Sequence, residues 1–192
     1  MKTSLFRFLF AFIRVHSGLI LLPVILHAAD TPRLSFTRDV VPIFTLGGCA
    51  GAACHGSIRG QNGFKLSLFG YEPELDYAAI TGGDGHRVNR ADPAKSLILQ
   101  KPTMQVAHGG GARFSPDSLE YRTILEWIGQ GAPLDAPGSP RISTLTVTPQ
   151  EHLFAAPGAA VQLRATAAYT DGTTRDVTHL VAYTSNNPDV AR

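Results

Sequence analysis

The first two thirds of the chain carry apolar residues at helical spacing in four short segments. These segments are 35–44, 72–80, 91–101 and 115–129. Apolar residues that recur every three or four positions lie on one face of a helix, which that face buries. The expected inward stripe of the last helix is Leu119, Ile124, Trp127 and Ile128. The expected N-caps of the first, third and fourth helices are Thr37, Asp92 and Ser115.

From residue 142 onward the pattern changes to a period of two. Leu145 and Val147 alternate with threonines, and Val161, Leu163 and Ala165 alternate with polar residues further on. Short alternating runs with turns between them predict an all-β sandwich. About four strands fit in this stretch, whereas such a sandwich has about seven. We therefore expect a partial domain, and a chain that is the N-terminal part of a larger protein.

The N-terminal segment 1–29 has the features of a secretory signal. Lys2, Arg7 and Arg14 supply its positive charge. An apolar stretch follows, and two alanines before Asp30 mark an expected cleavage site. The alternative is a retained membrane anchor, but polar residues and a proline interrupt the apolar run, which is shorter than the roughly 20 residues of a span. The expected location is periplasmic or extracellular, with no stable membrane span after cleavage.

Composition, charge and the spacing of carboxylates argue against two functions, nucleic-acid binding and catalysis. The chain has 192 residues and a hydrophobic content of 44%, which is enough for a packed core. Three of the 17 basic residues lie in the signal, so that 14 face 15 acidic residues in the rest of the chain. Without a basic patch, nucleic-acid binding is not expected. Carboxylates are scattered and no Ser-His-Asp order stands out, which favours electron transfer over catalysis.

The only two cysteines of the chain stand close together, and a histidine follows the second. The segment from Cys49 to His55 reads CAGAACH. Two thiols and an adjacent imidazole are the groups that hold a c-type haem, with the sulfurs on the porphyrin vinyl groups and the histidine on the iron. Four residues separate the cysteines where the usual number is two, so the spacer has to bulge. We interpret Cys49, Cys54 and His55 as the attachment site of one covalent haem c.

Two other interpretations of the cysteines stay open. A disulfide between Cys49 and Cys54 would close a small loop in an exported protein, but it gives no reason for His55 to follow. A structural zinc site needs four ligands, and the cysteines supply only two of them. Haem is the favoured interpretation, and the disulfide is the main alternative.

The second axial ligand of such a haem is expected between the last two helices, in KPTMQVAHGGGARF. His108 is the first choice and Met104 the second, because histidine and methionine are the usual ligands of electron-carrying haems. Glycines after His108 let the backbone approach a ring closely. Alternatively, Met104 fills a gap in the core and His108 is a solvated loop residue. His86, Arg87 and Arg90 either neighbour the propionates or form a solvated loop.

Residues 60–71 alternate apolar and polar side chains. Phe64, Leu66 and Leu68 are separated by Lys65 and Ser67. This period of two indicates a short strand or an extended segment with one buried side. Covering one face of a haem and ordinary core packing explain the pattern equally well.

Several blocks of the sequence resemble two known families. The blocks FTRDVVPIFTLGGCAGAACHG, GQNGFKLSLFGYEPELDY, HGGG and EWIGQGAP are similar to the cytochrome-c-like domain of large secreted planctomycete and verrucomicrobial proteins. The blocks LTVTP, APGAAVQLRATAAYTDGTTRDVT and YTSNNPDVA are similar to bacterial Ig-like domains of group 2. The resemblance implies one haem, with Cys49 and Cys54 as thioether attachments and His55 as proximal ligand. In related domains a Met-Pro segment supplies the distal ligand, and here the equivalent place reads Val106-Ala107-His108.

The expected fold class is a mainly α cytochrome-c-like haem domain followed by a partial all-β Ig-like sandwich. The expected parts are a signal peptide at 1–29, a haem domain at 30–133, a linker at 134–141 and an Ig-like domain at 142–192, truncated at its C-terminal end. The favoured function is a secreted mono-haem module that exchanges electrons with an unidentified redox partner. The alternative is a haem-free, disulfide-stapled binding or spacer module whose Ig-like part contacts a glycan or a cell-surface partner.

Overall fold

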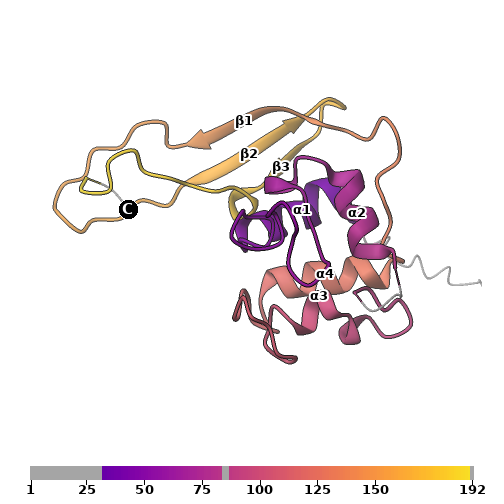
Figure 1. Cartoon of the computed structure of the whole chain (residues 1–192). Helices are drawn as coiled ribbons and strands as arrows, with labels where there is room; N and C mark the ends of the chain where they lie inside the picture. Colours follow the sequence, from indigo (N-terminus) through magenta and orange to yellow (C-terminus); the bar gives the residue numbers. More distant parts are fainter. Residues whose placement is uncertain (1–31, 84–86, 191–192) are drawn as a thin grey trace, which may run out of the picture. The chain divides into compact units, whose positions relative to one another are not determined.

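The computed structural model describes residues 32–83 and 87–190 (Figure 1). The expected signal segment 1–29 and His86 lie outside these ranges. The α-helices of the described part are α1 (Val41–Leu46), α2 (Pro73–Thr81), α3 (Leu97–Gln100) and α4 (Leu119–Gly129). A π-helical turn at Phe36–Val40 precedes α1, and 3-10 turns lie at Leu68–Gly70, Pro93–Lys95 and Thr178–Leu180. Within the described ranges no helix has the length and apolar character needed to cross a membrane.

The predicted helix at 35–44 is present but has a different cap and a broken start. Ser35, and not Thr37, is the N-cap, because its Oγ accepts a hydrogen bond from the Arg38 amide at 3.1 Å. Pro42 lies in the first turn of α1, where its missing amide hydrogen has no consequence. Gly47 ends the helix, as its position in the sequence predicts.

Serine side chains also decide where α3 and α4 begin. Ser96 is extended and its Oγ accepts from the Asn89 amide at 2.9 Å, so the helix predicted over 91–101 divides into a 3-10 turn and the short α3. Ser118 caps α4 by accepting from the Tyr121 amide at 3.2 Å. The predicted cap Ser115 instead bonds to Asp117. These side-chain hydrogen bonds compete with helical ones, and for this reason the predicted N-caps Thr37 and Ser115 are wrong.

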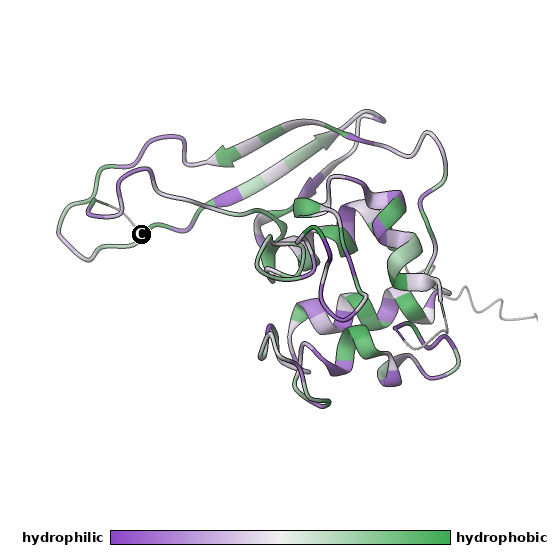
Figure 2. Ribbon diagram, viewed as in Figure 1, coloured by the Kyte–Doolittle hydropathy of each residue, from purple (hydrophilic) through white to green (hydrophobic). Residues whose placement is uncertain are grey.

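The helical part of the molecule, residues 32–133, encloses one apolar core. Trp127, Ile124 and Ile128 are fully buried, as the stripe on α4 predicts, whereas Leu119 at the start of α4 is 42% exposed. The indole of Trp127 donates a hydrogen bond from Nε1 to the Pro133 carbonyl at 3.0 Å. Figure 2 shows hydrophobic residues concentrated along α3 and α4. Core residues from the other elements are Phe36, Val40, Ile43, Phe44, Leu66, Ile80, Val88, Ile98, Leu99 and Ala132.

The strand part, residues 142–190, contains one small antiparallel sheet. Its strands are β1 (Ile142–Thr148), β2 (Arg164–Tyr169) and β3 (Thr174–Asp176), in the order β1-β2-β3. Thr146 pairs with Thr166, and Ala167 pairs with Arg175. Only Ala165, Ala167, Tyr169 and Val177 are buried hydrophobic residues here.

The expected fold class, a mainly α haem domain followed by a partial Ig-like sandwich, is wrong. The structure mixes short helices, turns and a three-stranded antiparallel sheet. In the described part of the chain no second sheet packs on the first, and Val161 and Leu163 lie outside the strands. The run at 60–71 forms no strand either, since glycines with positive φ at Gly60 and Gly63 bend it into turns.

The stretch expected to be a linker packs against the helical part. The carboxylate of Asp135 accepts hydrogen bonds from the Thr37 amide at 2.8 Å and from its hydroxyl at 2.5 Å. The guanidinium of Arg175 on β3 pairs with the buried carboxylate of Asp39 at 2.6 Å. The residues from Pro32 onward accordingly group into one compact unit.

Candidate functional site

A cavity of about 610 Å³ lies between the Cys49–His55 segment and the glycine-rich segment after α3. Its size falls within the roughly 300–1,000 Å³ of small-molecule and cofactor sites. One wall carries both cysteines and His55, and the other carries His108 and the glycines that follow it. The remaining lining residues are Phe44, Ala53, Gln61, Asn62, Phe64, Arg87, Leu97, Ile98, Lys101, Pro102, Ala107 and Arg113.

The cysteine-bearing segment is a coiled loop held by its own backbone. The His55 amide donates to the Cys49 carbonyl at 2.9 Å, and the Cys54 amide donates to the Gly51 carbonyl at 3.0 Å. A Cβ on Gly56 would collide with the Ala50 carbonyl oxygen, so only glycine fits directly after the histidine. The four-residue spacer is thereby folded back on itself, and both sulfurs stay beside the same cavity.

The two cysteines are free thiols in different surroundings. Cys49 is buried, whereas Cys54 is partly exposed. Burial raises the pKa of the Cys49 thiol to about 11, against the opposing effect of the Arg113 charge. Cys49 is therefore protonated at neutral pH. A buried, protonated thiol is a weak nucleophile toward soluble reagents.

The imidazoles of His55 and His108 are each fixed by a backbone carbonyl. Nδ1 of His55 donates to the Phe64 carbonyl at 3.0 Å, and Nδ1 of His108 donates to the Gly111 carbonyl at 2.9 Å. A carbonyl can only accept, so the proton of each neutral ring is on Nδ1 and the lone pair is on Nε2. This is the arrangement that metal-binding histidines show.

Burial lowers the pKa of His55, which favours the neutral ring. The hydrogen bond to Phe64 opposes this effect, and the positive groups of His108, Arg87 and Lys101 add to it. The phenyl ring of Phe64 also packs on the imidazole, with ring centroids 4.6 Å apart. His55 is thus favoured as a neutral imidazole, the form in which histidine binds metal ions.

The two imidazoles lie parallel across the cavity. Their ring centroids are 6.3 Å apart and their planes differ by 7°. Two imidazoles that share one iron through Nε2 have centroids about 6 Å apart, because each iron–nitrogen bond is about 2 Å and each centroid lies about 1 Å further. The centroid spacing and the parallel planes of this histidine pair are compatible with a single metal atom between the rings.

Met104, the second candidate for the distal ligand, lies outside the cavity wall. Its side chain is 49% exposed, and its backbone has a positive φ of 59°. Positive φ is uncommon for a residue with a side chain, and here it turns the chain after α3. The structure therefore brings Cys49, Cys54, His55 and His108 to one cavity and leaves Met104 apart from them.

Among the residues that the structure describes, three cationic side chains and no carboxylate line the cavity. The cations are Arg87, Lys101 and Arg113. The guanidinium carbon of Arg87 lies 4.7 Å from the centroid of the Phe64 ring, and both residues line the cavity. Arg90 points elsewhere, because its Nε donates to the Gly131 carbonyl at 3.0 Å. A haem carries two propionates, so a lining with a positive net charge suits a ligand of that kind.

Sequence reasoning overlooked Lys101 and Arg113. Lys101 follows α3 directly, and its Nζ donates to the Ala107 carbonyl at 3.2 Å. Arg113 follows the glycine triplet by two positions, and its amide donates to the Pro102 carbonyl at 2.7 Å. In both cases the signal in the sequence was a cationic residue near the glycine-rich segment that follows His108.

Other metal chemistry finds little support in these ranges. Over residues 32–83 and 87–190 no group of three or more His, Cys, Asp or Glu side chains is arranged to hold a metal ion. A zinc ion at the cysteines would thus lack the four protein ligands of a structural site.

Comparison with protein-family models, curated proteins and solved structures gives no match to this chain.

Proposed function

We propose that residues 32–133 form a mono-haem c-type module that carries single electrons. The observation that carries the proposal is the histidine pair, with parallel rings 6.3 Å apart and both Nδ1 atoms engaged by carbonyls. Two free cysteines on the same cavity support covalent rather than reversible binding. A bound haem would supply iron that cycles between the ferric and ferrous states.

Each residue of the cavity has a distinct role in this proposal. Cys49 and Cys54 would hold the macrocycle through sulfur, while His55 and His108 would bind its iron. The backbone bonds of the two histidines keep Nε2 directed for metal binding and hold both rings in place. Two nitrogen ligands favour a lower reduction potential than a histidine–methionine pair.

The charged residues of the wall would orient the group. Arg87 and Lys101 are the proposed partners of the propionates, since both line the cavity and neither has a carboxylate partner among the described residues. Phe44, Leu97 and Ile98 would exclude water from the ring. Excluding water around a redox centre strengthens the effect of nearby charges on it.

Secretion belongs to the same proposal. In bacteria covalent haem attachment is completed outside the cytoplasm, and the segment 1–29 has the composition of an export signal. We propose a periplasmic or extracellular protein that exchanges electrons with a separate redox partner. The strand part would act as a spacer or as a recognition surface for a glycan or a cell-surface molecule.

Spectroscopy of ligand variants tests the proposal. The full chain is exported from a bacterial host that attaches haem, and absorption and electron paramagnetic resonance spectra are recorded for the wild type and for His108→Ala, Met104→Ala and His152→Ala. We expect low-spin spectra except in His108→Ala, which should become largely high-spin. His152, an exposed histidine of the strand part, is the matched control. A high-spin spectrum in Met104→Ala with an unchanged His108→Ala would contradict the ligand assignment.

A further inference from the structure

Arg113 contacts both walls of the haem cavity. A Cβ added to Gly48 would lie 3.5 Å from its Nη1, and one added to Gly110 would lie 3.3 Å from its Nη2. Nη2 also donates a weak hydrogen bond to Sγ of Cys54, at 3.6 Å. The guanidinium thus lies between the segment that carries the cysteines and the segment that carries His108.

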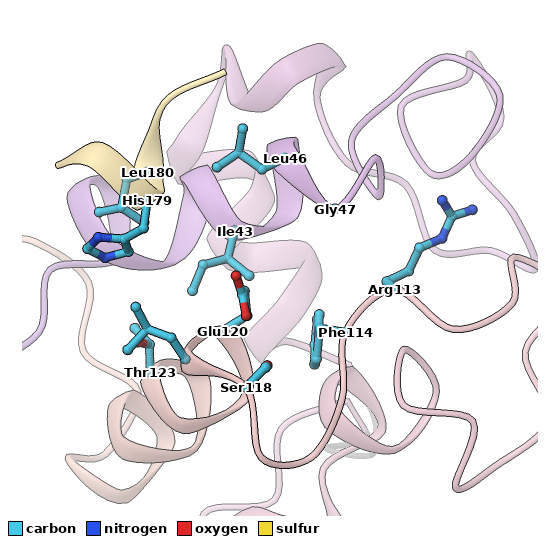
Figure 3. Close-up of a pocket in the computed structure, with 11 residues that line it drawn as sticks. Ile43, Leu46, Gly47, Arg113, Phe114, Ser118, Glu120, Thr123, His179 and Leu180 are labelled. Atoms are coloured by element: carbon cyan, nitrogen blue, oxygen red, sulfur yellow. The ribbon is translucent and has the colours of Figure 1, made fainter. Parts of the chain in front are cut away.

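The charge of Arg113 has no carboxylate partner in the part of the chain that the structure describes. The ion pairs there are Lys95–Asp92, Arg164–Asp176 and Arg175–Asp39. A smaller cavity of about 240 Å³ adjoins the site, and Glu120 is its acidic residue. Figure 3 shows the guanidinium of Arg113 directed away from Glu120 and from the other side chains of that cavity.

Arg113 also stands at the wrong edge to neutralise propionates. The vinyl groups that cysteines bond are on the opposite edge of the porphyrin from the propionates. A guanidinium beside Cys54 is therefore at the thioether edge, and Arg87 and Lys101 are left for the propionates. The positive charge of Arg113 stays uncompensated next to the macrocycle.

We propose that the positive charge of Arg113 raises the reduction potential of the site and so favours ferrous over ferric haem. This inference rests on the proposed function. Reduction lowers the positive charge on the iron, so a nearby fixed cation stabilises the reduced state. By Coulomb's law, a partly exposed unit charge at the edge of the macrocycle shifts the ferrous-to-ferric ratio by about two- to tenfold.

Redox titration of three variants tests this role. Arg113→Gln removes the charge, Arg113→Lys keeps it, and Arg59→Gln removes an exposed charge that is outside the cavity wall. Haem content is first measured as pyridine haemochrome, and midpoint potentials are then compared at low and high ionic strength. Of the three variants, we expect only Arg113→Gln to lower the midpoint potential, by an amount that corresponds to a two- to tenfold change in the ferrous-to-ferric ratio. The difference from wild type should shrink at high ionic strength, because salt screens the charge.

Several results would overturn the role of Arg113 while leaving the haem assignment intact. These are an unchanged potential in Arg113→Gln, an equal shift in Arg113→Lys, an equal shift in Arg59→Gln, and a failure of Arg113→Gln to load haem. Wild-type protein without haem would instead remove the proposed function, and this inference with it.

Discussion

The helical part and the strand part of this chain differ in how completely they bury their apolar residues. The helical part places Trp127, Phe36 and Leu99 in a closed core. The strand part buries two alanines, one tyrosine and one valine, and it leaves Ile142, Leu145 and Leu153 exposed. A sheet with one small buried side contributes little stability by itself. The contrast implies that the helical part is the stable frame, on which both the cavity and the sheet depend.

The connection between frame and cavity is direct. Phe44 belongs to the core and also lines the cavity, and Cys49 is buried in the same cluster. The His108 segment is tied to the frame through the bond from Arg113 to the Pro102 carbonyl. The positions of both histidines therefore depend on the same packed core.

Removing the largest core side chain should have the largest effect on stability. We expect Trp127→Ala to lower the free energy of unfolding by about 3–5 kcal/mol, because it opens a cavity and frees the Pro133 carbonyl. Leu153→Ala in the strand part should change it by less than about 0.5 kcal/mol, since this leucine is 93% exposed. Urea unfolding followed by circular dichroism measures both. Equal losses of unfolding free energy in the two variants would contradict the difference in burial between the helical part and the strand part.

The buried thiol predicts a pH dependence in haem-free, reduced protein. The folded state raises the pKa of Cys49 from its ordinary value of 9.0 to about 11. The folded protein keeps the proton over a range in which the unfolded chain releases it. The contribution of Cys49 to the free energy of unfolding is thus complete below pH 9. As the pH rises toward 11 this contribution is lost, which lowers the free energy of unfolding by about 2–3 kcal/mol.

Cys49→Ala isolates this effect from the other groups that titrate at high pH. We expect the stability of the variant to fall less than that of the wild type between pH 9 and pH 11, as measured by urea unfolding at each pH. Parallel curves for the two proteins would mean that Cys49 is solvated in the folded state.

The ion pair between Arg175 and Asp39 measures how firmly the sheet is held to the frame. The Asp39 side chain is only 6% exposed, so Arg175→Ala leaves a buried carboxylate with the Ser35 amide as remaining partner. We expect a loss of about 1–2 kcal/mol in unfolding free energy. The exposed pair Arg164–Asp176 is the control, and Arg164→Ala should cost less than about 0.5 kcal/mol. A loss in Arg164→Ala as large as that in Arg175→Ala would show that burial of the carboxylate is not the cause.

Local sequence signals predicted the helices well where proline, glycine and apolar spacing act together. The helix at 72–80 is present as α2, and the stripe of Ile124, Trp127 and Ile128 is buried. Caps were less predictable, because several serines compete for each helix start and tertiary partners decide between them. Thr37, for example, is bonded to Asp135, nearly a hundred residues away.

The strand part shows why alternation alone is a weak predictor of architecture. Leu145 and Val147 alternate correctly in β1, but a period of two says nothing about whether a second sheet covers the strand. At the site, the motif predicted Cys49, Cys54 and His55 as haem-attachment residues, and the structure places all three on one cavity. The preference for His108 over Met104 needed the structure for support, because only the fold of the glycine segment brings a ring opposite His55.

The mass of exported protein tests the central claim most directly. Intact mass spectrometry is performed on protein secreted by a host that attaches haem, after extraction with acidified acetone. Covalent haem on both sulfurs predicts a mass about 616 Da above that of the mature polypeptide, in a coloured protein. A colourless protein about 2 Da lighter than the reduced polypeptide, with Cys49 and Cys54 joined to each other, would contradict the account.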